Sequence, residues 1–215
     1  MNIVPYSNEI KDYLSASDVI DFNDEAIIAL SNQLAGAVSN EIAYIKSAYE
    51  YVRDNISHSS DIGADMITCS ATEVLKAGHG VCIAKSHLLA ALLRCKSIPA
   101  GFCYQKMILE DKAEPVFVYH GLNGVYIREY DKWIRLDARG NKAGIDAQFS
   151  IEEEKLAFTI RPEKGEEDDF FVYPEPDLNI VKKLRVSKTR KELWDHFPVK
   201  LSYEGTKVEI VMRKG

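Results

Sequence analysis

The chain has 215 residues and a formal net charge of −6, and 46% of its residues are hydrophobic against 28% charged. This balance is typical of a globular protein, and the length suits one domain with a single substantial core. The negative charge disfavours nonspecific binding to nucleic acid, and no apolar run approaches the roughly 20 residues needed to span a bilayer, so neither partner is expected.

The N-terminus and the cysteines bear on the cellular compartment. The first residues contain no charged segment followed by an apolar one, which predicts a protein without an export signal and therefore a cytoplasmic one. The four cysteines, Cys69, Cys82, Cys95 and Cys103, are then expected to be reduced thiols. No paired-cysteine motif occurs and the histidines are scattered, so we predict neither a metal nor another cofactor.

The first third of the chain is predicted to be mainly helical scaffold. Residues 1–19 indicate strand or coil followed by a short helical turn. Apolar residues at helical spacing then predict helices over residues 26–38 and about 41–56. A polar loop follows from His58 to Met66. His58 could line a cleft, but we expect it to be exposed to solvent. The residues Ser70-Ala71-Thr72-Glu73 form a capping box that should begin a short helix.

The central feature of the chain is a glycine-flanked turn followed by a cysteine and an apolar helix. Gly78 and Gly80 permit a sharp turn, and the helix should run from Cys82 to Cys95, since Pro99 prevents its continuation. Unpaired N–H groups and the helix dipole favour a thiolate at such a helix start. The alternative is that Cys82 is a small buried hydrophobe, as free cysteines often are.

The polar residues near Cys82, histidines included, bear on how deeply the start of this helix is buried. Lys85 and Ser86 argue against full burial of the first helical turn. We place His79 at the rim of a site, and His87 on a polar or rim side of the helix without a role.

The next segment predicts an antiparallel sheet that carries two further candidate residues. Strands are expected at residues 100–109, 116–120, 125–129 and 132–137. His120 ends the second strand and Asp137 ends the fourth. A thiol nucleophile needs a base within hydrogen-bond reach and a third group that orients the base. Cys82, His120 and Asp137 could supply these three roles, although their spacing alone does not show that they meet.

Residues beyond this sheet are predicted to form an extension. We assign residues 1–145 to a core and residues 146–215 to a C-terminal extension packed on it. Within the extension, the pattern predicts a strand segment at 149–160, a charged loop at 161–169, and helices at about 178–184 and 188–196. A hairpin turned at Glu204-Gly205 is expected over residues 199–212.

An ordered set of short motifs resembles the transglutaminase-like superfamily. The matching residues are Gly80-Val81-Cys82, Leu92-Leu93-Arg94, Ile98-Pro99-Ala100, His120 and Trp133-Ile134-Arg135-Leu136-Asp137, and the likeness covers about Tyr44 to Asn141. The resemblance implies an α+β fold with a papain-like core, in which N-terminal helices pack on an antiparallel sheet. It also implies a triad with Cys82 as nucleophile, His120 as base and acid, and Asp137 as the orienting carboxylate.

Three positions depart from the usual family pattern. The chain has His120-Gly121-Leu122 where members usually carry His-Ala-Trp, Arg139 where they carry a hydroxyl, and Ser97 where they often carry glycine. No triad member is lost, but the departures leave the substrate pocket unassigned.

The resulting hypothesis is a cysteine-dependent acyl-transfer enzyme. We expect a hydrolase (a protease, peptidase or amidase) acting on a peptide, a protein or a small amide, because no calcium-binding loop of the kind DxDxDG occurs. Alternatives are a transglutaminase-type amine acyltransferase, an inactive member that serves as a binding module, and a sugar-amide hydrolase similar to peptide N-glycanases. The last is disfavoured because those enzymes typically add a zinc site with paired cysteines. The Cys82 amide is one expected oxyanion donor, and the sequence does not name a second.

Overall fold

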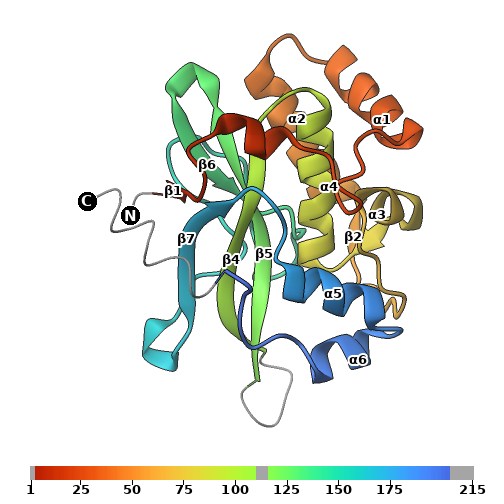
Figure 1. The fold of residues 1–215 in the computed structure, drawn as a ribbon, viewed down its shortest axis with the longest axis vertical. Coiled ribbons are helices and arrows are strands. Elements are labelled where there is room, and N and C mark those ends of the chain that lie inside the picture. Colours follow the sequence, from red (N-terminus) through yellow and green to blue (C-terminus); the bar gives the residue numbers. More distant parts are fainter. Residues whose placement is uncertain (1–2, 110–115, 204–215) are drawn as a thin grey trace.

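The computed structural model describes residues 3–109 and 116–203, and it has the predicted α+β architecture. A five-stranded sheet forms one side of the molecule and helices α1–α4 form the other (Figure 1). The helix α4, Cys82–Cys95, contacts β5 on one side and α1, α2 and α3 on the others. It is therefore the central element on which both halves pack.

The main sheet has the strand order β1-β7-β4-β5-β6. Its strands are β1 Val4–Pro5, β4 Ala100–Leu109, β5 Val116–Ile127, β6 Lys132–Leu136 and β7 Glu167–Tyr173. The neighbours β7, β4, β5 and β6 are antiparallel, and β1 is parallel to β7. A second sheet pairs β2, Ser57–His58, in parallel with β3, His79–Gly80.

The predicted strands at 116–120 and 125–129 are in fact one strand, and this part of the prediction was wrong. The strand β5 continues through Gly121 and Gly124 because every residue of β4, from Ala100 to Leu109, has a partner on it. A complete ladder on one side thus outweighs the low strand preference of glycine.

The helices agree closely with the predicted ones. They are η1 Ile10–Leu14, α1 Glu25–Gly36, α2 Glu41–Asn55, α3 Ala71–Ala77, α5 Leu178–Val186 and α6 Arg190–Asp195. The α-helices just named are capped by side chains at their N-termini, and the capping box of Ser70 and Glu73 is present as predicted. Local capping signals were therefore sufficient to place these helix starts.

The C-terminal part contains two corrections. Residues 149–160 form no strand, and the charged segment 161–169 is only partly a loop, since its last three residues begin β7. The free edge of β4 supplies the hydrogen bonds for β7, and Lys106 pairs with Glu167 at 2.9 Å across the two strands. Of the predicted hairpin at 199–212, residues 199–203 form no strand and the remainder lies outside the described residues. The proposed boundary at residue 145 stays a prediction.

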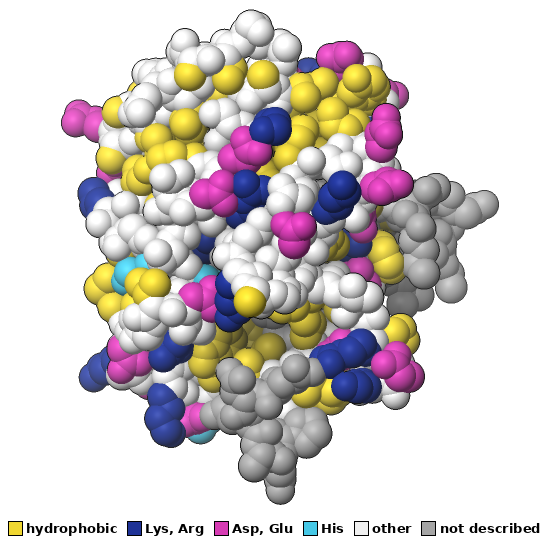
Figure 2. All heavy atoms as spheres, turned by 180° about the vertical axis from the view of Figure 1, so that it is seen from behind, with side chains coloured by type: hydrophobic (Ala, Val, Ile, Leu, Met, Phe, Trp, Pro, Cys, Tyr) yellow, Lys and Arg dark blue, Asp and Glu magenta, His cyan; other side chains and the backbone are white. Residues whose placement is uncertain are grey.

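Two further observations concern the charges on one face of the molecule and the lengths of its helices. On the face shown in Figure 2, Lys and Arg side chains lie among Asp and Glu side chains and exposed hydrophobic ones. Among the described residues, no helix is both long enough and apolar enough to cross a membrane.

Candidate active site

The nucleophile candidate occupies the first position of α4. Val81 is the N-cap and Cys82 follows it, so the thiol lies beside the unpaired N–H groups of the helix start. The preceding turn is tight, since Gly78 has a φ of 69° and a Cβ on Gly80 would lie 3.1 Å from the Thr68 hydroxyl. Cys82 itself is 6% exposed. The glycine turn therefore holds a buried thiol at the first turn of a densely packed helix.

The sheet brings His120 and Asp137 together. The last pair between β5 and β6 is Asn123 with Leu136, so His120 lies beyond the end of β6, where Asp137 begins the next turn. His120 Nε2 lies 2.7 Å from Asp137 Oδ2. The same carboxylate accepts backbone N–H groups from Arg139 at 3.1 Å and Ala157 at 3.0 Å. Because Nε2 is engaged by Asp137, Nδ1 is the ring nitrogen that remains for the thiol.

Electrostatics favour a charged pair between the thiol and this imidazole. Attraction and hydrogen bonding between the two side chains both favour their charged forms. Burial alone would raise the pKa of Cys82, but His120 lowers it well below its usual value. Burial likewise opposes the charged imidazole, yet Asp137 and Cys82 raise the pKa of His120 to about 10. Around neutral pH the site should therefore hold a thiolate and an imidazolium.

A second imidazole contacts the thiol, and here the sequence-based expectation was wrong. His58 was expected to be exposed, but it is only 9% exposed, and hydrogen bonding to His58 is one of the causes that lower the pKa of Cys82. Strand β2 places it there, because His58 pairs with Gly80, two residues before Cys82. Its Nδ1 accepts the Ser60 N–H at 3.3 Å, which leaves Nε2 as the protonated nitrogen of a neutral ring. Burial is the main cause that lowers the pKa of His58, so this ring stays neutral.

The expectations about four other polar residues around α4 were also wrong. Lys85, Ser86 and His87 are all buried, with exposed fractions of 0%, 3% and 0%. Each makes a backbone hydrogen bond: Ser86 donates to the Ile83 carbonyl at 2.7 Å, and His87 Nδ1 bonds the Cys69 carbonyl at 2.7 Å. His79, expected at a rim, is buried and bonds the Ser59 hydroxyl at 3.0 Å. Since α4 is surrounded on all sides, its polar residues have no solvent-facing side to occupy.

Residues from the C-terminal part complete the surroundings of the triad. The Phe158 ring meets the His120 ring edge-on, with centroids 4.9 Å apart, and the Ala157 amide holds Asp137. On the other side, Arg139 binds both carboxylate oxygens of Asp61, at 2.6 and 2.9 Å. This ion pair ties the loop after His58 to the loop after Asp137. The sequence pattern contained no signal for these contacts because they join distant irregular segments.

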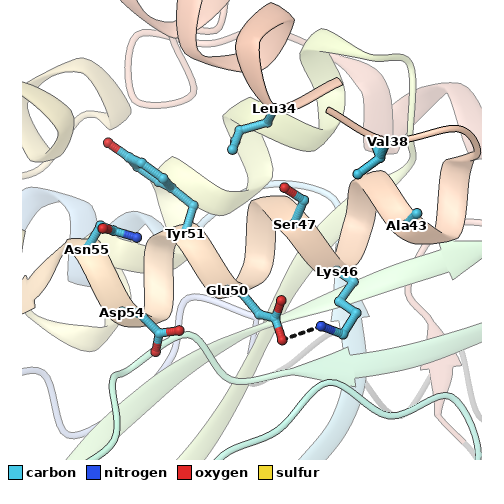
Figure 3. A pocket seen from close by; sticks show the side chains of 9 residues that line it. All are labelled: Leu34, Val38, Ala43, Lys46, Ser47, Glu50, Tyr51, Asp54 and Asn55. Carbon is cyan, nitrogen blue, oxygen red and sulfur yellow. Dashed lines mark hydrogen bonds and ion pairs between the residues drawn. The ribbon is translucent and has the colours of Figure 1, made fainter. Parts of the chain in front are cut away.

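Two hollows in the surface lie elsewhere. One, of about 480 Å³, runs along α2 beneath Leu34 and Val38 and contains the ion pair of Lys46 and Glu50 (Figure 3). Another, of about 270 Å³, lies between the end of α1 and Ile98. Neither is lined by Cys82, His58, His120 or Asp137, so chemistry rather than cavity shape identifies the candidate site.

In the described part of the chain, no cluster of three or more His, Cys, Asp or Glu residues could hold a metal ion.

Comparisons with known proteins identify the family of the chain and relatives of its fold. The family model described as the transglutaminase-like superfamily matches residues 28–138. No curated protein matches the chain significantly. Among solved structures, a candidate cysteine protease from Cytophaga hutchinsonii is 24% identical with a TM-score of 0.51, and the match covers 62% of this chain and 43% of that one. The periplasmic domain of TgpA from Pseudomonas aeruginosa is 14% identical with a TM-score of 0.44, over 61% of this chain and 48% of that one. This chain therefore matches less than half the length of each of these two solved proteins.

Proposed function

Because the chain belongs to the transglutaminase-like superfamily, we propose that it is a cysteine-dependent hydrolase of amide bonds in a peptide, a protein or a small amide. The observation that carries this proposal is the contact of the Cys82 thiol with His120, whose far nitrogen lies 2.7 Å from Asp137. A buried thiol polarised by an oriented imidazole is the arrangement that nucleophilic acyl transfer requires.

The proposed reaction has two halves. The Cys82 thiolate attacks the carbonyl carbon, and the electron pair of the C=O bond moves onto oxygen. When that pair returns, the C–N bond breaks, and the imidazolium of His120 gives its proton to the leaving amine. Water then attacks the thioester while His120 takes its proton. Collapse of this second intermediate releases the carboxylic acid and restores the thiolate.

We propose that two donors stabilise the oxyanion. The amide N–H of Cys82 belongs to the first turn of α4 and has no partner within the helix. The second donor is the Nε2–H of His58, whose ring is neutral; it faces the thiolate in the free enzyme and turns to the oxyanion once Cys82 has attacked the carbonyl. A neutral donor suits this role because it does not compete with His120 for the proton.

The departures at Gly121 and Arg139 are compatible with an active enzyme. A Cβ on residue 121 would lie 2.6 Å from Ile83 Cγ1, so α4 can approach β5 closely only where this strand carries glycine. Arg139 replaces a hydroxyl but forms a two-point ion pair with Asp61. Both departures therefore have a packing reason, which weakens the case for an inactive binding module.

Alkylation by iodoacetamide at pH 7 tests the nucleophile without knowledge of the substrate. A fully ionised thiol offers about 30-fold more thiolate at this pH than a cysteine of pKa about 8.5. Burial raises the pKa of Cys69 to about 11 and also raises that of Cys103, so both serve as slow internal references. We expect mass spectrometry to place the fast alkylation on Cys82. Four equally slow thiols would refute the proposal.

Turnover is then measured on a library of fluorogenic peptide amides, with the Cys82→Ala variant as the negative control. Cleavage by the native chain and not by the variant is expected, and equal cleavage by both would contradict the assignment. Added primary amine distinguishes the two acyl acceptors. If amine capture exceeded hydrolysis at low amine concentration, the chain would be an acyltransferase instead.

A separate pair of variants tests the role of His58. His58→Phe removes the donor while His58→Gln keeps an N–H group. Loss of one oxyanion donor typically lowers kcat by about 10²–10³. Alkylation by iodoacetamide forms no oxyanion, so its rate should change far less than turnover in His58→Phe. A parallel fall of both rates would show that His58 acts on the thiol and not on the oxyanion.

A further inference from the structure

Lys85 is a fully buried cation that the proposed reaction does not use. It lies one helical turn after Cys82 and is 0% exposed. Its Nζ donates to the carbonyl oxygens of Ile56 at 2.5 Å, Arg139 at 2.8 Å and Arg53 at 3.4 Å. An ammonium group has three N–H donors, so these three carbonyls satisfy it completely. Such a group is costly to bury unless it is fully bonded, and its burial calls for a reason.

The three carbonyls belong to the segments that carry the other site residues. Arg53 and Ile56 form the last turn and C-cap of α2, and Ile56 precedes His58 by two residues. Arg139 follows Asp137 by two residues. Lys85 itself lies on the helix that begins with Cys82. One ammonium group therefore joins the segments that carry the thiol, the second imidazole and the carboxylate.

The packing around this ammonium leaves little freedom. Gly140 has a φ of 109°, and a Cβ at this position would lie 3.3 Å from Lys85 Nζ and 3.2 Å from the Arg53 carbonyl oxygen. The α2 terminus and the loop after Asp137 thus meet across the lysine with no space for a side chain. A change in the ammonium group would be transmitted to both segments.

The charges around Lys85 couple it to the same residues. Burial is the largest cause that lowers its pKa to about 7, and Arg139 lowers it further. Asp137, Cys82 and Asp61 act in the opposite direction and favour the charged form. The interaction with Cys82 is mutual, because a cation favours a thiolate as much as a thiolate favours the cation.

We propose that Lys85 is a positioning residue of the active site, which fixes the segments of His58 and Asp137 against the helix start that carries Cys82. This inference rests on the proposed function. Lys85 touches no reacting atom, and it acts through the alignment and ionisation of the Cys82–His120 pair.

The test compares Lys85→Met with a matched control at the other end of the same helix. Arg94 is also a buried cation bonded to carbonyls, those of Ala100, Ser15 and Pro174, and it also forms an ion pair with Glu175 at 3.6 Å. It lies 12 residues after Cys82, or about 18 Å along the helix. Arg94→Met therefore removes a comparable buried charge without touching the site. The measurement is the pH dependence of Cys82 alkylation by iodoacetamide, together with thermal unfolding of each variant.

We expect Lys85→Met to raise the apparent pKa of Cys82 by about one unit, which is the size of shift that a nearby opposite charge produces. Arg94→Met should lower the melting temperature while leaving that titration unchanged. Lys85→Gln keeps two N–H donors and should fall between the native chain and Lys85→Met. The inference is overturned if both Lys85 variants titrate like the native protein, or if Arg94→Met shifts the thiol equally.

A measurement on the native chain covers the case in which neither Lys85 variant folds. The ¹⁵N resonance of Lys85 Nζ is followed against pH before and after Cys82 is capped with iodoacetamide. Capping removes the thiolate charge, so the pKa of Lys85 should fall, and an unchanged titration would refute the coupling. Failure of the proposed function looks different, because the native chain would then have no fast thiol to cap.

Discussion

The close approach of α4 to β5 gives a sharp prediction at Gly121. A Cβ at this position would lie 2.6 Å from the Cγ1 atom of Ile83 and 3.0 Å from the backbone of the same residue. Favourable carbon–carbon separations are about 3.5–4.0 Å, so the strand or the helix must move by about 1 Å in Gly121→Ala. The backbone of Ile83 cannot be avoided by a rotamer change. Because His120 is the preceding residue and Cys82 precedes Ile83, the displacement acts directly on the distance between imidazole and thiol.

Two magnitudes follow from this displacement. Overpacking of a well-packed core typically costs about 1–3 kcal/mol of stability. A misplacement of about 1 Å can lower a reaction rate by about 10². We therefore expect Gly121→Ala to fold, to melt at a lower temperature, and to alkylate at Cys82 about 10- to 100-fold more slowly at pH 7.

The assay is iodoacetamide alkylation followed by mass spectrometry, with thermal unfolding measured in parallel. Gly36→Ala is the matched control, because a Cβ there has nothing within 4 Å. Adding Ile83→Ala to Gly121→Ala relieves the overlap with the Ile83 side chain but leaves the overlap with its backbone, so recovery should be partial. If Gly121→Ala retained the native alkylation rate and stability, the packing explanation for this departure from the family pattern would be wrong.

Three further predictions concern other parts of the chain. Asp137→Asn removes the charge that raises the pKa of His120, so that pKa should fall and the pKa of Cys82 should rise. The rise of the Cys82 alkylation rate with pH should therefore move to higher pH. Burial lowers the pKa of His87 to about 4, below its unfolded value of about 6.5, so its stabilising contribution is complete above pH 6.5 and is lost as pH falls toward 4. The full loss amounts to about 3 kcal/mol, and His87→Gln should make urea unfolding correspondingly less sensitive to pH over this range. Ser97 has a φ of 57°, and Ser97→Gly should raise stability by up to about 1 kcal/mol, measured as a higher melting temperature, since relief of left-handed strain exceeds the added flexibility of the unfolded chain.

The parts of the structure that the sequence predicted are those set by local chemistry. The helix from Cys82 to Cys95 has the predicted ends, because a glycine turn precedes it and Pro99 follows it. The capping box at Ser70 likewise fixed the start of α3. His120 and Asp137 were expected on separate segments of the sheet, and the fold brings these two residues together.

The missed features depend on contacts between distant segments. His58 and Lys85 are polar, and polar residues are usually exposed, yet both are buried by partners that lie far along the chain. Strand β7 begins with acidic residues typical of a loop, and only the free edge of β4 makes it a strand. In each case, tertiary hydrogen bonds override a local preference, so no reading of neighbouring residues could have found them.

Each of the three departures from the family pattern has its own local explanation. Gly121 lacks a side chain where Ile83 leaves no room, and Arg139 forms an ion pair with Asp61. Ser97 adopts the left-handed backbone conformation that glycine would take more easily. Each substitution is thus matched by a local contact or tolerated at a small local cost, and none removes a partner of Cys82, His120 or Asp137. A binding module does not need a polarised thiol, since a buried cysteine packs equally well as a neutral group. The local reasons for these departures, together with the lowering of the Cys82 pKa by His120, favour the proposed nucleophile over a binding module.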